Sequence, residues 1–438
     1  MKYMHLSIGL LLTLILFFSC SSPERSAKKE LQAKGIEVTA DSLVAQAKVG
    51  NVNTVQLLLK AGVPIESAGV KGDRALSMAA AYGHIAVIHA LLSAGADIDR
   101  RDKHGYTALT SAVRMGKVEA ATVLLKAGAN AAIESDTDKS ALDIAIEKKN
   151  WPMVTALGKA GVNLDRRDKD GRTKLMEAID NGEKELAEAL IAAGADFTIP
   201  DYSGEKPFSK AVNQNLFHLA ALMAQQGTDV NSVYFISKEY SPLMSAIEHE
   251  NVELVKALID AGANVNFAIR ESQISCLYTA VYYKQKDIVV MLIEAGADVN
   301  AKNIYRDTPL YRVTVDPAGK DLEIAEIILQ SGADINAVVN VDGRTALHVA
   351  VLESDDMLDS LAFLLEKGAA TDIYDNKGQT PLTLAALHNK PKAAKALIEA
   401  GADVNYPAMN GDKPRYTAEK LEHNEIARML RVAGATKK

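Results

Sequence analysis

Cysteine, aromatic side chains and an excess of basic charge are all scarce in this chain of 438 residues. Its two cysteines, Cys20 and Cys276, are too few and too far apart for a disulfide framework or a cysteine-based metal cluster. The formal net charge is -7, so the basic field that nucleic-acid binding requires is missing. The hydrophobic fraction of 48% is that of an ordinary globular chain. We therefore expect a chain that buries a core and binds no nucleic acid.

Long apolar runs are also rare, and the one that occurs lies at the start of the chain. It extends over thirteen residues from Leu6 to Phe18 and follows Lys2. A transmembrane helix needs about 20 apolar residues, so this run is too short to span a bilayer. A positive start and an apolar run of this length are typical of a secretory signal peptide. We expect residues 1–19 to be such a signal peptide.

The end of this leader carries a second feature. The sequence Phe17-Phe18-Ser19-Cys20 resembles the lipobox of bacterial lipoproteins, which implies that Cys20 becomes the lipid-modified first residue of the mature chain. The alternative is an ordinary secretory leader cut nearby, with Cys20 there by chance. Residues 20–40 are polar and predict a flexible tether after the lipid. In such lipoproteins an aspartate after the cysteine favours inner-membrane retention. Because Ser21 stands there instead, we expect the outer membrane, at its periplasmic face or at the cell surface.

Glycine recurs at intervals of 33 to 36 residues through the rest of the chain. The positions are Gly62, Gly95, Gly128, Gly161, Gly194, Gly227, Gly262, Gly296, Gly332, Gly368, Gly401 and Gly434. Apolar residues stand three, four and usually seven places earlier, as Leu92, Leu91 and Ile88 do before Gly95. This is the spacing of one helix face. Glycine just after such a face is typical of a helix that ends in the left-handed conformation, so a helix is expected to close each period.

Each period also contains a polar turn and the start of another helix. Asp375-Asn376-Lys377-Gly378 is such a turn, and Thr380-Pro381-Leu382-Thr383 follows it. Threonine caps the first amides of a helix, and proline suits its first turn. Thr345-Ala346-Leu347-His348 repeats the pattern one period earlier. A 33-residue period with helix starts of this kind resembles the ankyrin-repeat family.

The resemblance covers nearly everything from residue 41 onward. It implies an all-α ankyrin-repeat solenoid of about twelve helix-turn-helix units with short β-turn fingers, over residues 41–438. Terminal repeats must seal the apolar stack, so residues 41–62 and 415–438 are predicted to be its N-terminal and C-terminal caps. Stacked layers of this kind would form a curved rod that offers surface and no central pocket.

No group of residues predicts catalysis or a metal site. His84 and His348 occupy positions where ankyrin repeats use histidine for structural hydrogen bonds. Asp168-Lys169-Asp170-Gly171 lacks the ligand spacing of a calcium loop and is interpreted as a solvated turn. Cys276 has no basic residue within three positions, so we expect a packed and inert thiol. The sequence therefore predicts neither an enzyme nor a cofactor, and no small-molecule substrate.

The resemblance implies that partner proteins contact the finger tips and the exposed ends of the first helices, on the concave face. Aromatic residues and methionine are enriched at binding hot spots, and two groups of them occur at such places. The first group precedes the turn between the two helices, and the second lies in two unusually apolar fingers. The candidates are Tyr82, Met115, Tyr282 and Tyr283 in the first group, and Tyr234, Phe235, Ile236 and Phe267 in the second. The alternatives are tyrosines that pack on each other and fingers that cover themselves.

Three functional hypotheses remain at this point. The leading one is a non-enzymatic scaffold or adaptor that a lipid on Cys20 anchors to the bacterial cell envelope and that binds another protein. The membrane is then contacted through the lipid anchor only. A second hypothesis is a structural envelope protein that acts by self-association. A third, a hydrolase without a recognisable site, has no motif to support it.

Overall fold

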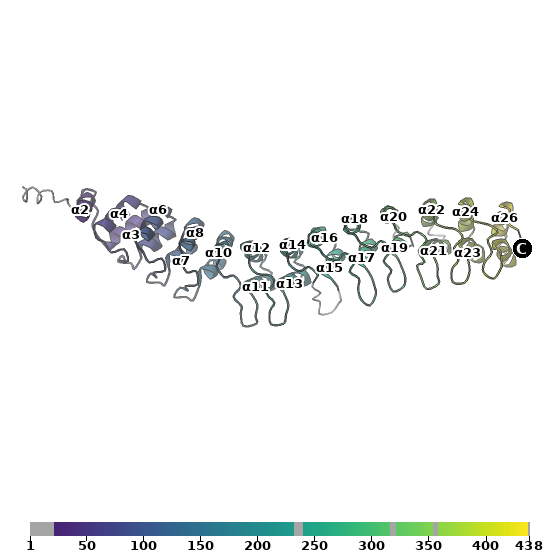
Figure 1. Ribbon diagram of the computed structural model, residues 1–438, viewed down its shortest axis with the longest axis horizontal. Coiled ribbons are helices and arrows are strands. Elements are labelled where there is room, and N and C mark those ends of the chain that lie inside the picture. Colours follow the sequence, from purple (N-terminus) through teal and green to yellow (C-terminus); the bar gives the residue numbers. More distant parts are fainter. Residues whose placement is uncertain (1–21, 232–239, 316–320, 354–357, 437–438) are drawn as a thin grey trace, which may run out of the picture. The chain divides into compact units, whose positions relative to one another are not determined.

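The computed structural model describes residues 22–231, 240–315, 321–353, 358–436, and their contacts divide the chain into two compact units. Unit 1 is Met1–Pro207 and unit 2 is Phe208–Lys438. The described residues form α-helices joined by turns and loops (Figure 1), with isolated backbone bridges at Ala68–Arg74 and Ala268–Ser275. None of the helices in the described ranges is both long and apolar enough to span a membrane.

Both units consist of helix pairs, apart from the single helix α2 at the start of unit 1. In unit 1 the helices are α2 (Pro23–Ala33), α3 (Ala40–Val49), α4 (Val52–Lys60), α5 (Ala75–Tyr82), α6 (Ile85–Ser93), α7 (Ala108–Arg114), α8 (Val118–Lys126), α9 (Ala141–Glu147), α10 (Trp151–Lys159), α11 (Lys174–Asp180) and α12 (Lys184–Ala193). The helix α13 (Pro207–Asn213) begins at the last residue of unit 1 and otherwise belongs to unit 2. The other helices of unit 2 are α14 (Phe217–Gln225), α15 (Pro242–Glu248), α16 (Val252–Asp260), α17 (Cys276–Tyr282), α18 (Lys286–Glu294), α19 (Pro309–Val315), α20 (Leu322–Gln330), α21 (Ala346–Leu352), α22 (Leu358–Glu366), α23 (Pro381–Leu387), α24 (Pro391–Glu399), α25 (Pro414–Lys420) and α26 (Asn424–Val432). The prediction of a helix-pair repeat solenoid is confirmed within each unit.

The predicted helix ends are confirmed at every period. All twelve repeating glycines have positive φ values, between 83° and 95°. The residue four places before each of them is completely buried, as Leu91, Leu258 and Leu292 are. Within each unit, helices contact their partner in the pair and the equivalent helix of the neighbouring pair, as α23 contacts both α24 and α25. Apolar surface is therefore buried layer against layer.

The segment predicted as a flexible tether contains a helix. Residues 23–33 form α2, which Ser22 caps by accepting a hydrogen bond from the Arg25 N–H at 3.3 Å. Ala27 and Leu31 are buried, and α2 packs against α4. The prediction for residues 20–40 is therefore wrong over α2, because two apolar residues at helical spacing suffice when a neighbouring helix covers them. The packed N-terminal end consequently begins at Pro23 and not at residue 41. Cys20 lies outside the described residues.

The turn between the two helices of a pair also requires left-handed backbone. Gly83, Gly116 and Gly182 adopt it in three pairs, but Lys149 (φ 52°) and Lys284 (φ 57°) occupy the same turn without being glycine. A side chain costs about 1–2 kcal/mol in this conformation.

We expect Lys149→Gly to stabilise unit 1 by about 0.5–1 kcal/mol, because glycine removes this strain but adds freedom to the unfolded chain. Hydrogen exchange of the α9 and α10 amides should slow accordingly. The neighbouring exposed Lys148 has ordinary right-handed backbone (φ -79°) and provides the control. Lys148→Gly should destabilise the same helices, and equal effects of the two changes would contradict the explanation.

In most repeats a polar side chain four residues after the closing glycine bonds to the next repeat. The Asn300 Oδ1 accepts a hydrogen bond from the Asp334 N–H at 2.8 Å, and its Nδ2 donates to the Gly332 carbonyl at 3.3 Å. Asn266 bonds in the same way to the repeat that follows it. In unit 1, Asp99 accepts from the Asn130 N–H at 2.9 Å.

We expect Asn300→Ala to destabilise the α19–α20 repeat locally by about 1 kcal/mol, because two hydrogen bonds between repeats are lost. The exchange of the Asp334 amide should then accelerate about fivefold, which is the same free energy expressed as a rate ratio. Asn300→Asp keeps the acceptor, as Asp99 does naturally, and should leave most of the protection intact. Equal loss of protection in both variants would show that the bond to Asp334 contributes nothing.

Candidate functional site

In most of the described pairs the first helix ends at a position that is exposed on the surface. In unit 1 three successive pairs present an apolar residue there: Val49, Tyr82 and Met115, which are between 41% and 66% exposed. The Tyr82 ring stacks on His84 at 6.5 Å between centroids, and the Lys48 ammonium lies 5.2 Å from its centre. Sequence reasoning identified Tyr82 and Met115 but missed Val49, which occupies the equivalent place at the end of α3.

In unit 2 the corresponding place carries the paired tyrosines Tyr282 and Tyr283, which are 50% and 42% exposed. Their rings meet edge to face, with centroids 5.1 Å apart and planes at 88°. The Arg312 guanidinium, from α19, lies over the Tyr282 ring at 4.6 Å from its centre. The two tyrosines therefore pack on each other, which was the alternative to a partner contact, and about half of their surface remains exposed.

Two more residues complete this group. Tyr240, which precedes α15, donates a hydrogen bond to the carboxylate of Glu248 at the end of α15. Glu248 is half-buried and also lies close enough to Tyr283 to act on it electrostatically. We call Tyr240, Glu248, Tyr282, Tyr283 and Arg312 the tyrosine cluster; its members come from three neighbouring helix pairs of unit 2.

The electrostatics of the tyrosine cluster are set by burial and by one carboxylate. Burial raises the pKa of Tyr240 and of Tyr283, and the negative charge of Glu248 raises both pKa values further. Both effects disfavour the phenolate. Tyr240 and Tyr283 therefore stay neutral hydrogen-bonding groups beside a negative charge.

The apolar fingers differ from one another. Phe267 is half-buried in a finger that closes on itself, where the Ile274 carbonyl accepts the Ile269 N–H at 3.0 Å and the Phe267 carbonyl accepts the Cys276 N–H at 3.2 Å. Tyr234, Phe235 and Ile236 lie outside the described residues.

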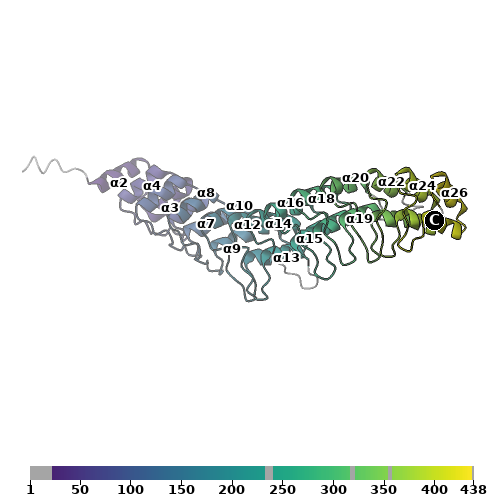
Figure 2. The same ribbon diagram turned by 45° about the vertical axis from the view of Figure 1, so that its right-hand side comes forward.

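Exposed apolar residues at the tips of other fingers had been missed. Ile304, Tyr305, Val341 and Met409 are each more than half exposed in unit 2. Adjoining tips are hydrogen-bonded: the Asn376 N–H donates to the Asp342 carbonyl at 2.8 Å, and the Met409 N–H donates to the Gly378 carbonyl at 2.9 Å. The fingers project from the same side of the helix pairs of this unit (Figure 2). An apolar residue beside the turn glycine, as in Val341-Asp342-Gly343, is the signal that could have identified them.

The residues that the sequence excluded from chemistry have structural partners. Cys276 is buried, and burial raises the pKa of its thiol to about 12, so little reactive thiolate forms at neutral pH. The His84 Nε2 lies 2.9 Å from the Lys48 carbonyl oxygen. His348 is buried and bonds to Thr345 and to the Gln379 carbonyl.

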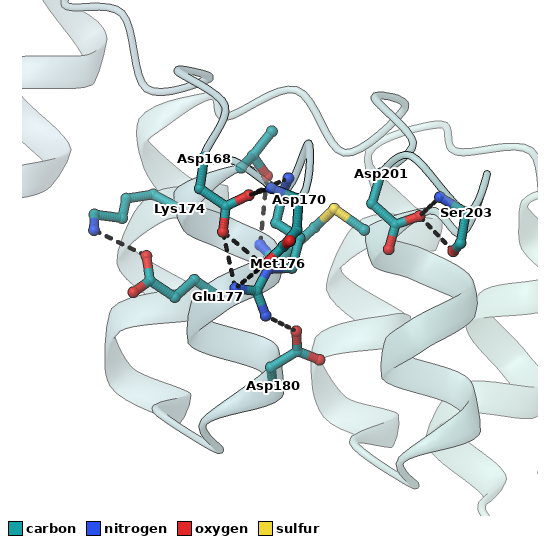
Figure 3. A network of polar contacts seen from close by, with 10 residues as sticks. Asp168, Asp170, Lys174, Met176, Glu177, Asp180, Asp201 and Ser203 are labelled. Atoms are coloured by element: carbon teal, nitrogen blue, oxygen red, sulfur yellow. Dashed lines mark hydrogen bonds and ion pairs between the residues drawn. The ribbon is translucent and has the colours of Figure 1, made fainter.

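The predicted turn at Asp168 is held by its own side chains (Figure 3). The Asp168 Oδ1 accepts from the N–H groups of Asp170 and Arg172, both at 2.8 Å. The Arg172 guanidinium also contacts the carboxylate of Asp180, at 3.4 Å. These bonds hold the finger against α11. Within the described ranges, no group of three or more histidine, cysteine, aspartate or glutamate residues could hold a metal ion.

A cavity of about 490 Å³ lies beside this turn in unit 1. Part of its charged lining is paired: Arg166 contacts Glu134 at 3.4 Å, and Lys174 contacts Glu177 at 2.9 Å. Arg167 donates to the Pro200 carbonyl at 2.9 Å. Ser140 and Asp143 in the lining cap the start of α9. The lining therefore supplies ion pairs and a helix cap, in which the Ser140 hydroxyl donates to the Asp143 carboxylate at 2.6 Å.

The family model and the curated relatives agree with the helix-pair architecture. The family model for "Ankyrin repeats (3 copies)" matches residues 42–135, 128–201, 208–303 and 314–408. The nuclear factor NF-kappa-B p105 subunit of Gallus gallus is 30% identical over 41% of this chain and 18% of its own length. An ankyrin repeat protein of Rickettsia felis is 32% identical over 26% of this chain and 38% of its own length. This chain thus spans well under half the length of these curated relatives. The solved structure of an ankyrin repeat domain from Acinetobacter baumannii AYE is 28% identical, with a TM-score of 0.40, over 44% of this chain and 98% of that chain.

Proposed function

The chain belongs to the ankyrin-repeat family, and on that premise we propose that it is a non-enzymatic scaffold that recognises another protein. Ankyrin-repeat domains mediate protein–protein interaction. The observation that carries the proposal is the tyrosine cluster, where exposed aromatic rings are held by neighbouring side chains on packed helices. Rigid aromatic groups of this kind bind at low entropic cost, since little side-chain freedom remains to be lost. The apolar finger tips of unit 2 provide further contact surface.

The proposal includes the location of the protein. We place it in the bacterial cell envelope, anchored by a lipid on Cys20, with the outer membrane as the site of the anchor. The leader of residues 1–19 and the Phe17-Phe18-Ser19-Cys20 sequence support this part. Intact-mass analysis tests it: the mature wild type should carry the mass of a lipid on Cys20, and Cys20→Ala should accumulate unlipidated. A mature wild-type chain without added mass would contradict the anchor and leave the binding proposal standing.

Protein binding is tested by crosslinking in living cells followed by mass spectrometry. We expect the wild type to crosslink to a second protein, and the double variant Tyr282→Ala/Tyr283→Ala to lose at least nine-tenths of that product, since hot-spot truncations cost about 2 kcal/mol or more. The matched control is Tyr374→Ala/Tyr406→Ala, which removes another contacting tyrosine pair of unit 2 at 5.3 Å. Unchanged crosslinks in the Tyr282/Tyr283 variant would contradict the assigned surface. Crosslinks only between copies of this chain would favour self-association instead.

A further inference from the structure

The exposed ends of the first helices in unit 1 indicate which chemistry a partner presents, an inference that rests on the proposed function and makes it more specific. Three successive helix pairs expose both apolar and cationic residues at this place, where the first helix turns into the second. We call these residues the unit 1 strip: Lys48, Val49, Tyr82, Arg114, Met115 and Lys117.

Short distances join the three pairs. The Lys48 Nζ lies 5.2 Å from the centre of the Tyr82 ring, and the Lys48 carbonyl oxygen lies 2.9 Å from the His84 Nε2. A Cβ atom on Gly83, the residue after Tyr82, would lie 3.3 Å from the Lys117 Cδ. The helix α5 packs against both α3 and α7. The unit 1 strip is therefore one continuous surface over three helix pairs.

The cations of the unit 1 strip keep their charge. Within the described ranges, Lys48, Arg114 and Lys117 have no ion-pair partner. The Arg114 guanidinium lies over the Tyr106 ring, 4.6 Å from its centre, much as Lys48 lies over Tyr82. An aromatic ring attracts a cation without cancelling its charge. The strip therefore presents positive potential beside its exposed apolar side chains.

The helix pair that follows extends this charge. It carries the exposed Lys148 and Lys149 at the same place, and its first helix, α9, packs against α7. The carboxylate next to them, Glu147, is bound to the Lys139 ammonium at 2.6 Å. The formal net charge of the whole chain is -7, so this positive surface is a local exception.

We propose that the unit 1 strip binds an acidic segment of the partner protein that also carries a large apolar side chain. Carboxylates of this segment pair with the cations of the strip, and its apolar side chain covers Val49, Tyr82 and Met115. Arg114 suits this role, because a guanidinium bonds a carboxylate in a fork.

The size and sign of the charge favour a short segment over a polyanion. A nucleic acid or an anionic lipid surface extends beyond the strip and meets the net negative charge of the rest of the chain. Three apolar residues between the cations also match a protein segment, in which acidic and apolar side chains alternate within a few residues.

The experiment uses random twelve-residue peptides displayed on phage and selected on the full mature chain. Peptides are kept when they bind the wild type but not Tyr82→Ala/Met115→Ala, and their affinities are then measured as synthetic peptides. We expect them to share aspartate or glutamate beside a large apolar residue. Replacing the acidic residues by their amides should weaken binding about tenfold, and added salt should reduce the difference.

Arg114→Glu/Lys117→Glu provides the decisive variant. It should bind the selected peptides at least about tenfold more weakly, because like charges then face each other. Lys60→Glu/Lys126→Glu makes the same change of net charge at exposed positions on the opposite ends of α4 and α8, and should leave the affinity nearly unchanged. Peptides with lysine in place of their acidic residues should bind the Arg114/Lys117 variant better than the wild type. Circular dichroism of each variant confirms that it is folded.

The outcomes separate this proposal from the proposed function. Strip-dependent peptides with a basic or purely apolar motif, or equal losses in the two charge variants, would overturn the acidic segment as the occupant. Failure to select any strip-dependent peptide would overturn the strip as a binding surface. Strip-dependent binding to vesicles of equal parts phosphatidylglycerol and phosphatidylcholine, without such peptides, would assign the strip to a membrane instead. None of these results involves Tyr282 or Tyr283, whose crosslinking test decides the proposed function separately.

Discussion

Gly158→Leu is expected to destabilise unit 1 by about 3 kcal/mol, although leucine is what the repeat pattern favours at that position. Gly158 stands three places before Gly161, where neighbouring periods carry a large apolar residue such as Leu92. The helix α10 packs closely on α12 at this point. A Cβ atom on Gly158 would lie 2.5 Å from the Ala193 carbonyl oxygen and 2.8 Å from the Leu164 Cδ1. Since the first of these is a backbone atom, the helices themselves would have to move apart.

Hydrogen exchange measures this effect locally, which matters because repeat proteins need not unfold in one step. The amides of α10 and α12 should lose protection in Gly158→Leu. Lys159→Leu adds the same side chain at the next, exposed position of α10 and should leave protection nearly unchanged. Combining Gly158→Leu with Ala193→Gly removes one clashing methyl group but not the carbonyl, so only partial recovery is expected. Full stability of Gly158→Leu would show that α10 and α12 can separate at little cost.

His348→Ala is expected to destabilise unit 2 by about 2–4 kcal/mol, because a buried group with two hydrogen bonds is lost. The His348 Nδ1 accepts the Thr345 N–H at 3.2 Å, and its Nε2 lies 3.2 Å from the Gln379 carbonyl oxygen. These partners require the neutral imidazole with its proton on Nε2. The alanine variant would leave the buried Thr345 N–H without its acceptor.

The same residue predicts how stability depends on pH. Burial lowers the pKa of His348 below its ordinary value of 6.5. The unfolded chain therefore binds a proton below about pH 6.5 while the folded chain does not, so stability is lost as the pH falls through this range. One such proton contributes at most about 1.4 kcal/mol per pH unit.

His348→Thr is the control for this titration, because a threonine, Thr383, occupies the equivalent place in α23. There the Thr383 hydroxyl oxygen lies 3.0 Å from the Thr380 hydroxyl oxygen. Urea unfolding of both proteins between pH 7.5 and 5.5 isolates the histidine, since the other groups are common to both. The stability difference between wild type and His348→Thr should shrink as the solution becomes more acidic. A difference that is constant across this range would contradict a neutral buried histidine.

Most of the fold could be predicted from the repeat period, because each helix pair depends on features that are close together in the sequence. The closing glycines and the apolar residues four places before them sufficed to locate the second helices. In contrast, α2 is not part of the repeat pattern, and only its contact with α4 explains why Ala27 and Leu31 are buried. Gly158 could be seen as an exception in the pattern, but only the packed helices show that its missing side chain is required.

The candidate site was predictable only in part. Tyr282 and Tyr283 are adjacent in the sequence, so their place at a helix end marked them directly. Glu248 and Arg312 lie in neighbouring repeats, and nothing in their local sequence distinguishes them from ordinary surface charge. Whether they lie close to the tyrosines depends on how successive helix pairs pack against each other, which the repeat period alone does not determine.

The helix α2 also changes the reach of the proposed anchor. If the lipid sits on Cys20, only Ser21 and Ser22 separate it from Pro23, where α2 begins. A fully extended residue spans at most about 3.6 Å, so two of them extend roughly 7 Å. The start of α2 would then lie close to the bilayer surface. Partners that bind this end of the protein would have to be membrane-proximal molecules.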